Sequence, residues 1–205
     1  IEVSGITFTH DGKVILRDVD LNIEKGKKYL VRGPSGSGKS TLISLLSRTY
    51  DDYSGRILVD GTDLRFVSEE DFNRHTAYIY QDVFLFEDSL RENIALYKDF
   101  TDEEVLNAAR ASGLEDFLSR MPEGLDTRIE ENGKNLSGGE RQRISIARAV
   151  IRKPDILFAD EITSAMDEEL GRKVEETVLG LDTTVVAVSH RFYSGISDKY
   201  DAVLE

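Results

Sequence analysis

One stretch of eight residues has the composition and spacing of a loop that binds nucleotide phosphates. Gly33-Pro34-Ser35-Gly36-Ser37-Gly38-Lys39-Ser40 follows the apolar run 29–31 and precedes a helical pattern, the order found in strand, phosphate loop and helix. Its glycines leave backbone N–H groups bare, and the helix start adds a positive dipole end. Lys39 supplies charge for terminal phosphates, Ser40 a ligand for magnesium, and Thr41 a donor to the first phosphate. A chance glycine-rich turn is the alternative.

Two adjacent acids follow a run of four apolar residues further along the chain. The run 156–159 reads as a buried strand, and Asp160 and Glu161 come directly after it. Asp160 suits the shell of a magnesium ion, usually through water, and Glu161 suits the acceptance of a proton from an attacking water. The alternative is a strand that ends in two solvated acids. A phosphate loop upstream favours the chemical interpretation.

A second helix start has the features of an anion site. Ser137 and Glu140 have the spacing of a capping box, which would be a purely structural role. A capping box does not require Gly138 and Gly139 between them, and these two glycines bare the backbone N–H groups at the start of the helix. Since the chain has one phosphate loop, this second site is surplus within a monomer.

The order of apolar segments predicts a mixed α/β fold. Strands are expected early in the chain and again near its end, with a helical insert over 89–118 and a helix over 167–179. The expected strands are 1–3, 6–8, 14–15, 21–23, 29–31, 56–59, 156–159 and 185–188. Alternation of this kind places ligands at the carboxyl ends of parallel strands.

Composition excludes several classes of protein. The 205 residues, 40% of them hydrophobic, suffice for a large core, and no apolar run approaches the roughly 18 residues that cross a bilayer. There is no cysteine, so disulfides and thiolate metal sites are excluded. A net charge of -13 argues against a nucleic-acid groove.

These motifs together resemble the nucleotide-binding domains of ATP-binding cassette (ABC) transporters. The resemblance covers nearly the whole chain, and its six motifs occur in the family's order. They are the phosphate loop 33–40, Gln81 as the Q-loop glutamine, the signature 136–140, Asp160-Glu161 as Walker B, Ser164 to Asp167 as the D-loop, and His190 as the switch histidine. The resemblance implies a P-loop NTPase (RecA-like) core with an N-terminal antiparallel β-subdomain and an inserted α-helical subdomain.

The resemblance also implies a mechanism. ATP and Mg2+ would lie between the phosphate loop of one domain and the signature of a second domain in a head-to-tail dimer, with Ser137, Gly138 and Gly139 on the nucleotide. Water would attack the terminal phosphate directly. Glu161 and His190 would be catalytic, Gln81 would join Ser40 and Asp160 at magnesium, and Asp167 would contribute at the nucleotide site. Taken alone, Gln81, Asp167 and His190 would be read as ordinary structural residues.

The sequence departs from the family pattern at the adenine-stacking position. His10 stands where the family has an aromatic residue, and Phe8 is expected to face the core because side chains alternate along a strand. We expect His10 to contact the base. Glu140 stands where many exporters have glutamine.

Two further segments favour the exporter branch of the family. They are 82–86 followed by 89–94, and 127–133, which resembles the exporters' X-loop with Glu131 at its acidic position, although Glu130 stands where the family usually has glycine. We therefore expect an export ATPase domain, with a core at about 1–82 and 150–205 and a helical subdomain at about 83–149. It would be excised from a longer chain with an N-terminal transmembrane domain and would work on the cytoplasmic side of the membrane. The alternatives are a stand-alone importer ATPase subunit and a non-transport interaction ATPase of the family.

Overall fold

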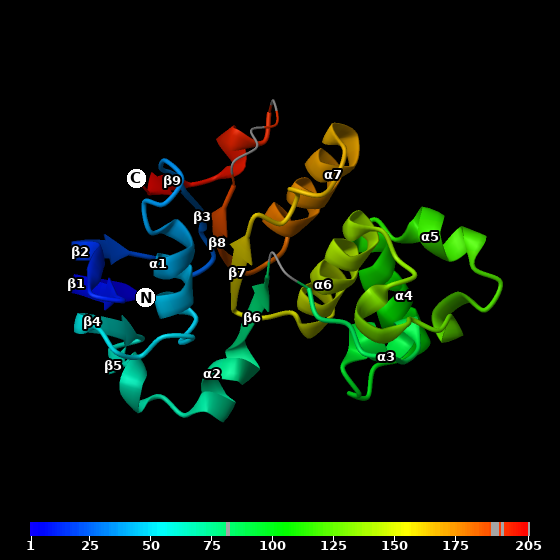
Figure 1. Ribbon diagram of the computed structural model, residues 1–205, viewed down its shortest axis with the longest axis horizontal. Helices are drawn as coiled ribbons and strands as arrows, with labels where there is room; N and C mark the ends of the chain where they lie inside the picture. Colours follow the sequence, from blue (N-terminus) through cyan, green and yellow to red (C-terminus); the bar gives the residue numbers. More distant parts are fainter. Residues whose placement is uncertain (81–82, 190–192, 194, 205) are drawn as a thin grey trace.

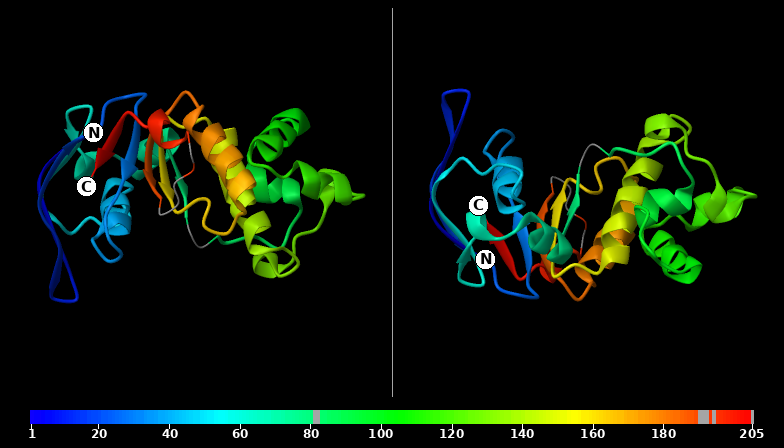
Figure 2. Two further views of the ribbon diagram at one scale, coloured as in Figure 1. Left: turned by 90° about the horizontal axis from the view of Figure 1, so that it is seen from above. Right: turned by 90° about the horizontal axis from the view of Figure 1, so that it is seen from below.

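The protein has two sheets and a group of helices arranged along one long axis. The structure is a computed structural model, and it describes residues 1–80, 83–189, 193 and 195–204. An antiparallel sheet lies at one end, a parallel sheet in the middle, and the helices α3 to α6 at the other end (Figure 1). The two views from above and below show the same order along the long axis (Figure 2).

The parallel sheet has five strands in the order β6-β7-β8-β3-β9. Their bounds are β6 (Thr76–Ile79), β7 (Ile156–Asp160), β8 (Thr184–Val188), β3 (Lys28–Val31) and β9 (Ala202–Leu204). Strands β3, β7 and β8 are almost wholly buried, as their near-continuous apolar sequence predicts. Val31, Val188 and Asp160 stand side by side in the pairing register, so the three strands end at one level.

Helices cover both faces of this sheet. Helix α1 (Lys39–Leu46) shares one hydrophobic cluster with Val31, Phe158 and Val186. Helices α6 (Gly138–Arg152) and α7 (Glu168–Leu179) share a second cluster with Leu157 and the alternate residues of β8. The strand side chains alternate between the two clusters, which is the expected pattern for a sheet buried on both sides.

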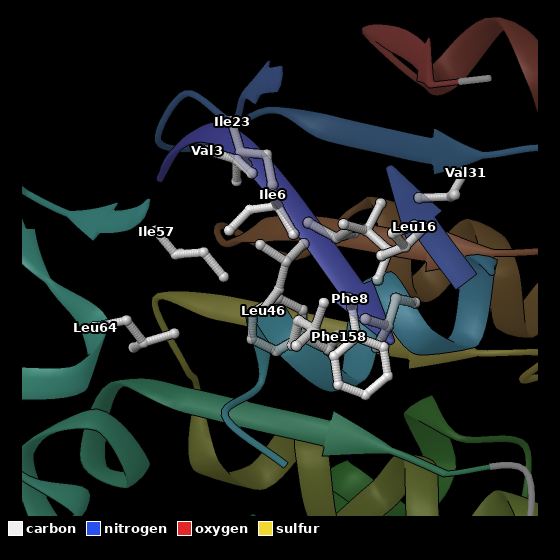
Figure 3. Close-up of a cluster of buried hydrophobic side chains, with 14 of the residues drawn as sticks. Val3, Ile6, Phe8, Leu16, Ile23, Val31, Leu46, Ile57, Leu64 and Phe158 are labelled. Atoms are coloured by element: carbon white, nitrogen blue, oxygen red, sulfur yellow. The ribbon is translucent and has the colours of Figure 1, made fainter. Parts of the chain in front are cut away.

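The antiparallel sheet packs on α1 from the other side. Its order is β2-β1-β4-β5, with bounds β2 (Lys13–Asn22), β1 (Glu2–His10), β4 (Ser54–Val59) and β5 (Thr62–Asp63). Figure 3 shows Ile6, Phe8 and Leu46 converging in the core between this sheet and α1. Phe8 is 5% exposed, so the expectation that it faces the core is confirmed.

The early strands are longer than the sequence pattern predicts. The expected strands 1–3 and 6–8 form one strand, β1, and 14–15 and 21–23 form one strand, β2. Gly5 and Asp18 both have left-handed backbone, and the register shifts between Val3 and Phe8. The Gly5 N–H donates to Asp20 and the Asp18 N–H to Thr7, so side chains replace the missing ladder bonds.

The expected helical insert consists of three short helices. They are α3 (Leu90–Ala95), α4 (Asp102–Ala111) and α5 (Glu115–Arg120). A third hydrophobic cluster joins them to Ile144, Ala147 and Ile151 of α6. Because Ile146 and Ala149 of α6 belong to the cluster under the parallel sheet, this one helix ties both regions together. The division into subdomains stays a prediction, and its expected boundary near residue 150 lies inside α6.

Some elements had no counterpart in the sequence-based interpretation. Helix α2 (Glu69–His75) and strand β6 follow one another directly, and 3-10 turns η1 to η4 occupy 64–66, 124–126, 131–133 and 197–199. The side chain of Ser68 accepts a hydrogen bond from the Asp71 N–H at the start of α2, so the N-cap was a readable signal. Across the described part of the chain, no helix combines the length and apolarity needed to cross a membrane.

One carboxylate is buried without full hydrogen bonding. Glu175 lies on the inner face of α7, is 4% exposed, and accepts a hydrogen bond of 2.7 Å at Oε1 from the Tyr200 hydroxyl. Its Oε2 is buried and has no hydrogen-bond partner among the described residues. Burial raises the pKa of Glu175, and the bond from Tyr200 offsets this only partly. The folded protein therefore favours the protonated carboxyl group.

Glu175 makes stability depend on pH in a defined direction. A raised pKa in the folded state contributes stability that is present below the ordinary value of 4.5 and is lost as pH rises through the folded pKa. We expect Glu175→Gln to raise the melting temperature at pH 7 by a few °C, the scale that about 1 kcal/mol produces in a domain of this size. Calorimetry from pH 4.5 to 8 should show the gain shrinking toward acid pH. The exposed Glu103→Gln is the control, and an equal effect of both substitutions would contradict the assignment.

Candidate functional site

The phosphate loop lies between β3 and α1, where its backbone geometry requires glycine. Gly38 is the N-cap of α1 with φ +94°, and no side chain caps the helix. A Cβ at Gly38 would lie 2.7 Å from Leu16 Cδ2, and one at Gly33 would lie 2.6 Å from Ser37 Oγ. Both glycines therefore keep the loop tight against its neighbours. The first N–H groups of α1 stay without side-chain acceptors, which suits an anion at this end.

Lys39 directs its charge into the loop. Its side chain is 8% exposed, and Nζ donates to the carbonyl oxygens of Gly33 at 3.0 Å and Pro34 at 2.9 Å. Both acceptors are neutral, whereas the ammonium group has three N–H donors and a full positive charge. An anion in the loop would therefore meet an ammonium group already in place. Ser40 is exposed and Thr41 is half-buried in the first turn of α1.

A cavity of about 580 Å³ opens beside the loop. Its walls come from three elements: β2, the end of β3 with the loop, and α1. They include Ile15, Leu16, Arg17, Arg32, Gly33, Pro34, Ser37, Gly38 and Lys39. The cavity is mainly apolar where β2 lines it, and polar at the loop. This pairing of an apolar wall with a phosphate loop suits a ligand that has both an organic and an anionic part.

The two acids of the predicted metal and base site lie at the same edge of the sheet. Asp160 ends β7 and is 8% exposed, and it pairs in register with Val188 of β8, which pairs with Val31 of β3. Because neighbouring strands are about 4.8 Å apart, the backbone of Asp160 lies roughly 10 Å from that of Val31, the last residue of β3. The loop that follows β3 and the carboxylate of Asp160 therefore lie at the same edge of the sheet, on either side of the end of β8.

The backbone changes direction at Glu161. Its φ of +51° is uncommon for a residue other than glycine, and its N–H donates to Val188 O at 3.0 Å. The chain thus turns away from β7 at Glu161, immediately after Asp160, and the hydrogen bond to Val188 of β8 holds the backbone of Glu161 in place. Strain of this kind is often found at functional sites. The phenol of Tyr78 has a raised pKa, first because of burial and then because of Asp160, so it is a neutral neighbour of that carboxylate.

Two predicted site residues, Gln81 and His190, lie outside the described residues. The strands before them, β6 and β8, end at Ile79 and Val188. Their register places both ends at the edge that carries the loop and Asp160. The roles of Gln81 and His190 stay predictions.

The second predicted anion site lies at the start of α6. Ser137 is the N-cap, and its Oγ accepts from the Glu140 N–H at 3.2 Å, so the capping box predicted as the structural role is present. Ser137 and Gly138 are exposed, and Gly139 is half-buried. A Cβ at Gly139 would lie 3.1 Å from Ala165 O, so the glycine lets the D-loop approach the helix.

A cavity of about 560 Å³ lies at this helix start. Its walls are Val83, Asn132, Lys134, Gly138, Arg141, Gln142, Ser164 and Ala165. The structure thus brings together the signature, the X-loop and the D-loop, which are far apart in sequence. Arg141 and Gln142 were not predicted as site residues. Their spacing of three and four residues from Gly138 places them on one helix face and was the signal.

The remaining predicted contacts have clear local roles. Asp167 is the N-cap of α7 and accepts from the Leu170 N–H at 2.9 Å, which is a structural role of the kind expected for this residue taken alone. His10 ends β1 and is exposed. Its ring centroid lies 6.3 Å from that of Phe8 and 6.1 Å from that of Tyr50. The three rings form a small aromatic group, and contact of His10 with adenine stays a prediction.

Comparisons with known proteins agree with this arrangement. The sequence profile of one family, described as ABC transporter, matches residues 16–164. The chain belongs to the ABC transporter family. It is a nucleotide-binding domain of the exporter type, and the predicted P-loop NTPase fold is confirmed.

The relatives of this ABC transporter domain are longer proteins. It is 43% identical over 93% of its length to a putative multidrug export ATP-binding/permease protein, YgaD of Bacillus subtilis, and covers 34% of that protein. It is 42% identical over 93% of its length to an ATP-dependent lipid A-core flippase of Syntrophus aciditrophicus, and covers 32% of it. The chain thus spans about a third of the length of these curated relatives.

A solved structure supports the same branch of the family. The domain superposes with a TM-score of 0.91 and 35% identity on the structure of a bacterial Atm1-family ABC exporter with ATP bound, covering all of this chain and 37% of that one. The expectation of an export ATPase domain is confirmed at this level, and the importer alternative is not favoured.

The position of Lys39 gives a direct test of the phosphate loop. We expect Lys39→Ala to weaken ATP binding by at least about 100-fold, because the ammonium is the one side-chain charge in the described loop and is nearly buried. Isothermal titration with ATP measures the affinity. The exposed Lys13→Ala at the start of β2 is the control. Unchanged binding by Lys39→Ala would contradict the loop assignment.

Proposed function

We propose that this domain binds ATP with Mg2+ in the phosphate loop and hydrolyses it to drive export. The loop supplies bare helix N–H groups and the Lys39 ammonium for the phosphates. Ser40 and Asp160 supply a hydroxyl and a carboxylate, a donor set that fits magnesium, which takes few protein ligands and completes its shell with water and phosphate. Magnesium, when bound, would neutralise charge on the terminal phosphate.

The protein residues then act mainly by position. Lys39 binds the terminal phosphate groups and holds them near the edge of the sheet. Glu161 accepts the proton of the attacking water, and the left-handed backbone at this residue turns its chain away from the strand that ends with Asp160. Gln81 and His190 are proposed from their places after β6 and β8, as partners of magnesium and of the terminal phosphate.

The observation that carries the proposal is the separation of two anion sites. The cavity at the phosphate loop and the cavity at the start of α6 have no lining residue in common. Each helix start offers N–H groups to phosphate, and the separate linings of the two cavities support the proposal that two chains, not one, close them on the same nucleotide. A head-to-tail pair of domains unites the loop of one copy with Ser137, Gly138 and Gly139 of the other, and Asp167 would face the shared site.

The partner in export would be a transmembrane domain, which the relatives contain in one chain as export ATP-binding/permease proteins. An exposed aromatic group suits such a contact: Phe84 is 63% exposed, Tyr97 60% and Phe86 38%. Arg148 of α6 lies 5.9 Å from the Phe86 ring and bonds the Phe84 carbonyl oxygen, so the group is fixed in place. The domain would work at the cytoplasmic side of a cell membrane, without nucleic acid, in keeping with a charge of -13.

Replacement of the proposed base separates binding from turnover. We expect Glu161→Gln to bind ATP as the wild type does, to hydrolyse it at least about 100-fold more slowly, and to accumulate as an ATP-bound dimer. Phosphate release measures turnover, and sedimentation velocity with saturating ATP and Mg2+ measures association.

The neighbouring Glu168→Gln, on the exposed first turn of α7, is the matched control for this experiment. Turnover at the wild-type rate in Glu161→Gln would show that another group is the base. A strictly monomeric sample would contradict the paired arrangement.

A further inference from the structure

The start of α6 carries a negative charge at the point where it would meet phosphate. Oε2 of Glu140 accepts from the Ser137 N–H at 2.8 Å and lies 2.8 Å from Ser137 Oγ. The Ser137 Oγ also accepts from the Glu140 N–H at 3.2 Å. The carboxylate therefore holds the hydroxyl proton of Ser137, one of the donors that a phosphate group would use.

A guanidinium group offsets this charge. Arg120, the last residue of α5, donates from Nη2 to Oε1 of Glu140 at 3.0 Å. The Glu140 side chain is 13% exposed and that of Arg120 is 63% exposed, so solvent reaches the cation more than the anion. Partial burial raises the pKa of Glu140, but the bonds from Ser137 and Arg120 outweigh this and lower it, so the carboxyl group is ionised at neutral pH.

A second arginine lies near the same helix start. Arg143, one turn along α6, is close to Gly139, where an added Cβ would lie 3.3 Å from its Nη1. Burial lowers the pKa of Arg143, and the nearby Glu140 and Asp167 raise it. The negative charge of Glu140 offsets part of the positive charge of Arg120 and Arg143. Without it, both arginines would attract an incoming anion more strongly.

A second capping box, at the start of α4, provides a comparison for the one at the start of α6. At the start of α4, Glu104 Oε2 accepts from the Thr101 N–H at 2.9 Å, and the Glu104 N–H donates to Thr101 Oγ1 at 3.3 Å. Glu104 is exposed, and its pKa is lowered first by its hydrogen bonds to Thr101 and only then by the charge of Lys153, with no arginine of the described chain involved. The capping function therefore needs no arginine partner, so helix capping alone does not explain the pair of Arg120 and Glu140.

We propose that Glu140 and Arg120 are positioning residues that set how strongly the start of α6 binds the terminal phosphate of a nucleotide held by a second copy of this chain. Glu140 weakens the contact, because it repels the anion and engages the Ser137 hydroxyl. Arg120 strengthens the contact, because it offsets the carboxylate. The inference rests on the proposed head-to-tail pairing.

The test removes each charge and keeps the side-chain size. All variants carry Glu161→Gln, so that ATP is not consumed, and the dissociation constant of the dimer is measured by sedimentation equilibrium with saturating ATP and Mg2+. Glutamine also fits a capping box, so Glu140→Gln keeps the cap while removing the charge. We expect Glu140→Gln to tighten the dimer by about tenfold and Arg120→Gln to loosen it by about threefold or more, consistent with unit charges a few Å from phosphate.

Matched controls separate this effect from folding. Glu104→Gln changes the other capping box, and Arg74→Gln removes an arginine of similar exposure, 62%, that pairs with Glu70. Neither should change the dimer. Neither Glu140→Gln nor Arg120→Gln should change the ATP affinity of the monomer, because the phosphate loop is elsewhere. The difference between Glu140→Gln and its parent should shrink from 50 to 500 mM salt, which a purely structural role would not produce.

The outcomes distinguish this inference from the proposed function. If the Glu161→Gln parent forms a dimer and Glu140→Gln and Arg120→Gln associate equally well, the inference is overturned and the pairing stands. If none of the samples associates at saturating ATP, the pairing is overturned, and the inference with it. A tighter dimer with Glu104→Gln of the same size would also overturn it, because any lost acid would then suffice.

Discussion

The common level at which the parallel strands end is the constraint on which the site depends. Val31, Val188 and Asp160 are neighbours in register across β3, β8 and β7. Backbone hydrogen bonds fix this alignment, and clusters on both faces of the sheet bury it. A slip of one residue would turn every side chain of a strand to the opposite face, so the register is strongly specified. The loop after β3 and the acids at the end of β7 are therefore brought to the same edge of the sheet.

The starts of α1 and α6 differ in how far their N–H groups are already hydrogen-bonded within the chain. Helix α1 begins at a glycine with no side-chain cap, so its first N–H groups are left for a ligand and Lys39 supplies the charge. Helix α6 begins with Ser137 and Glu140 bonded to each other, so part of its capacity is already used within the chain. The first arrangement suits strong binding within one chain. The second would suit the weaker, reversible contact that we propose between two domains.

Much of the fold could be predicted because its signals are local. The helices near 138 and 168 begin at side-chain caps, and the strands 156–159 and 185–188 are apolar runs, all of which a short window reveals. Strand β1 was split in the prediction because Gly5 interrupts its pattern, whereas in the fold its pairing with β2 and β4 and the long-range bonds of Gly5 to Asp20 and of Asp18 to Thr7 keep it continuous. Strand β6 was missed because Thr76–Ile79 follows α2 directly, with no turn residue to mark its start, and is less apolar than the runs at 156–159 and 185–188.

Residue types at fixed spacing are enough to reveal which chemical groups the chain carries: the phosphate loop with Lys39, the acids Asp160 and Glu161, and the helix start at Ser137. Folding is what brings particular groups together. The strand register brings Asp160 to the edge of the phosphate loop, and packing brings the D-loop, Arg141 and Gln142 to the start of α6. Only the folded chain shows Arg120 on Glu140, because a contact across 20 residues and two helices depends on how α5 and α6 pack.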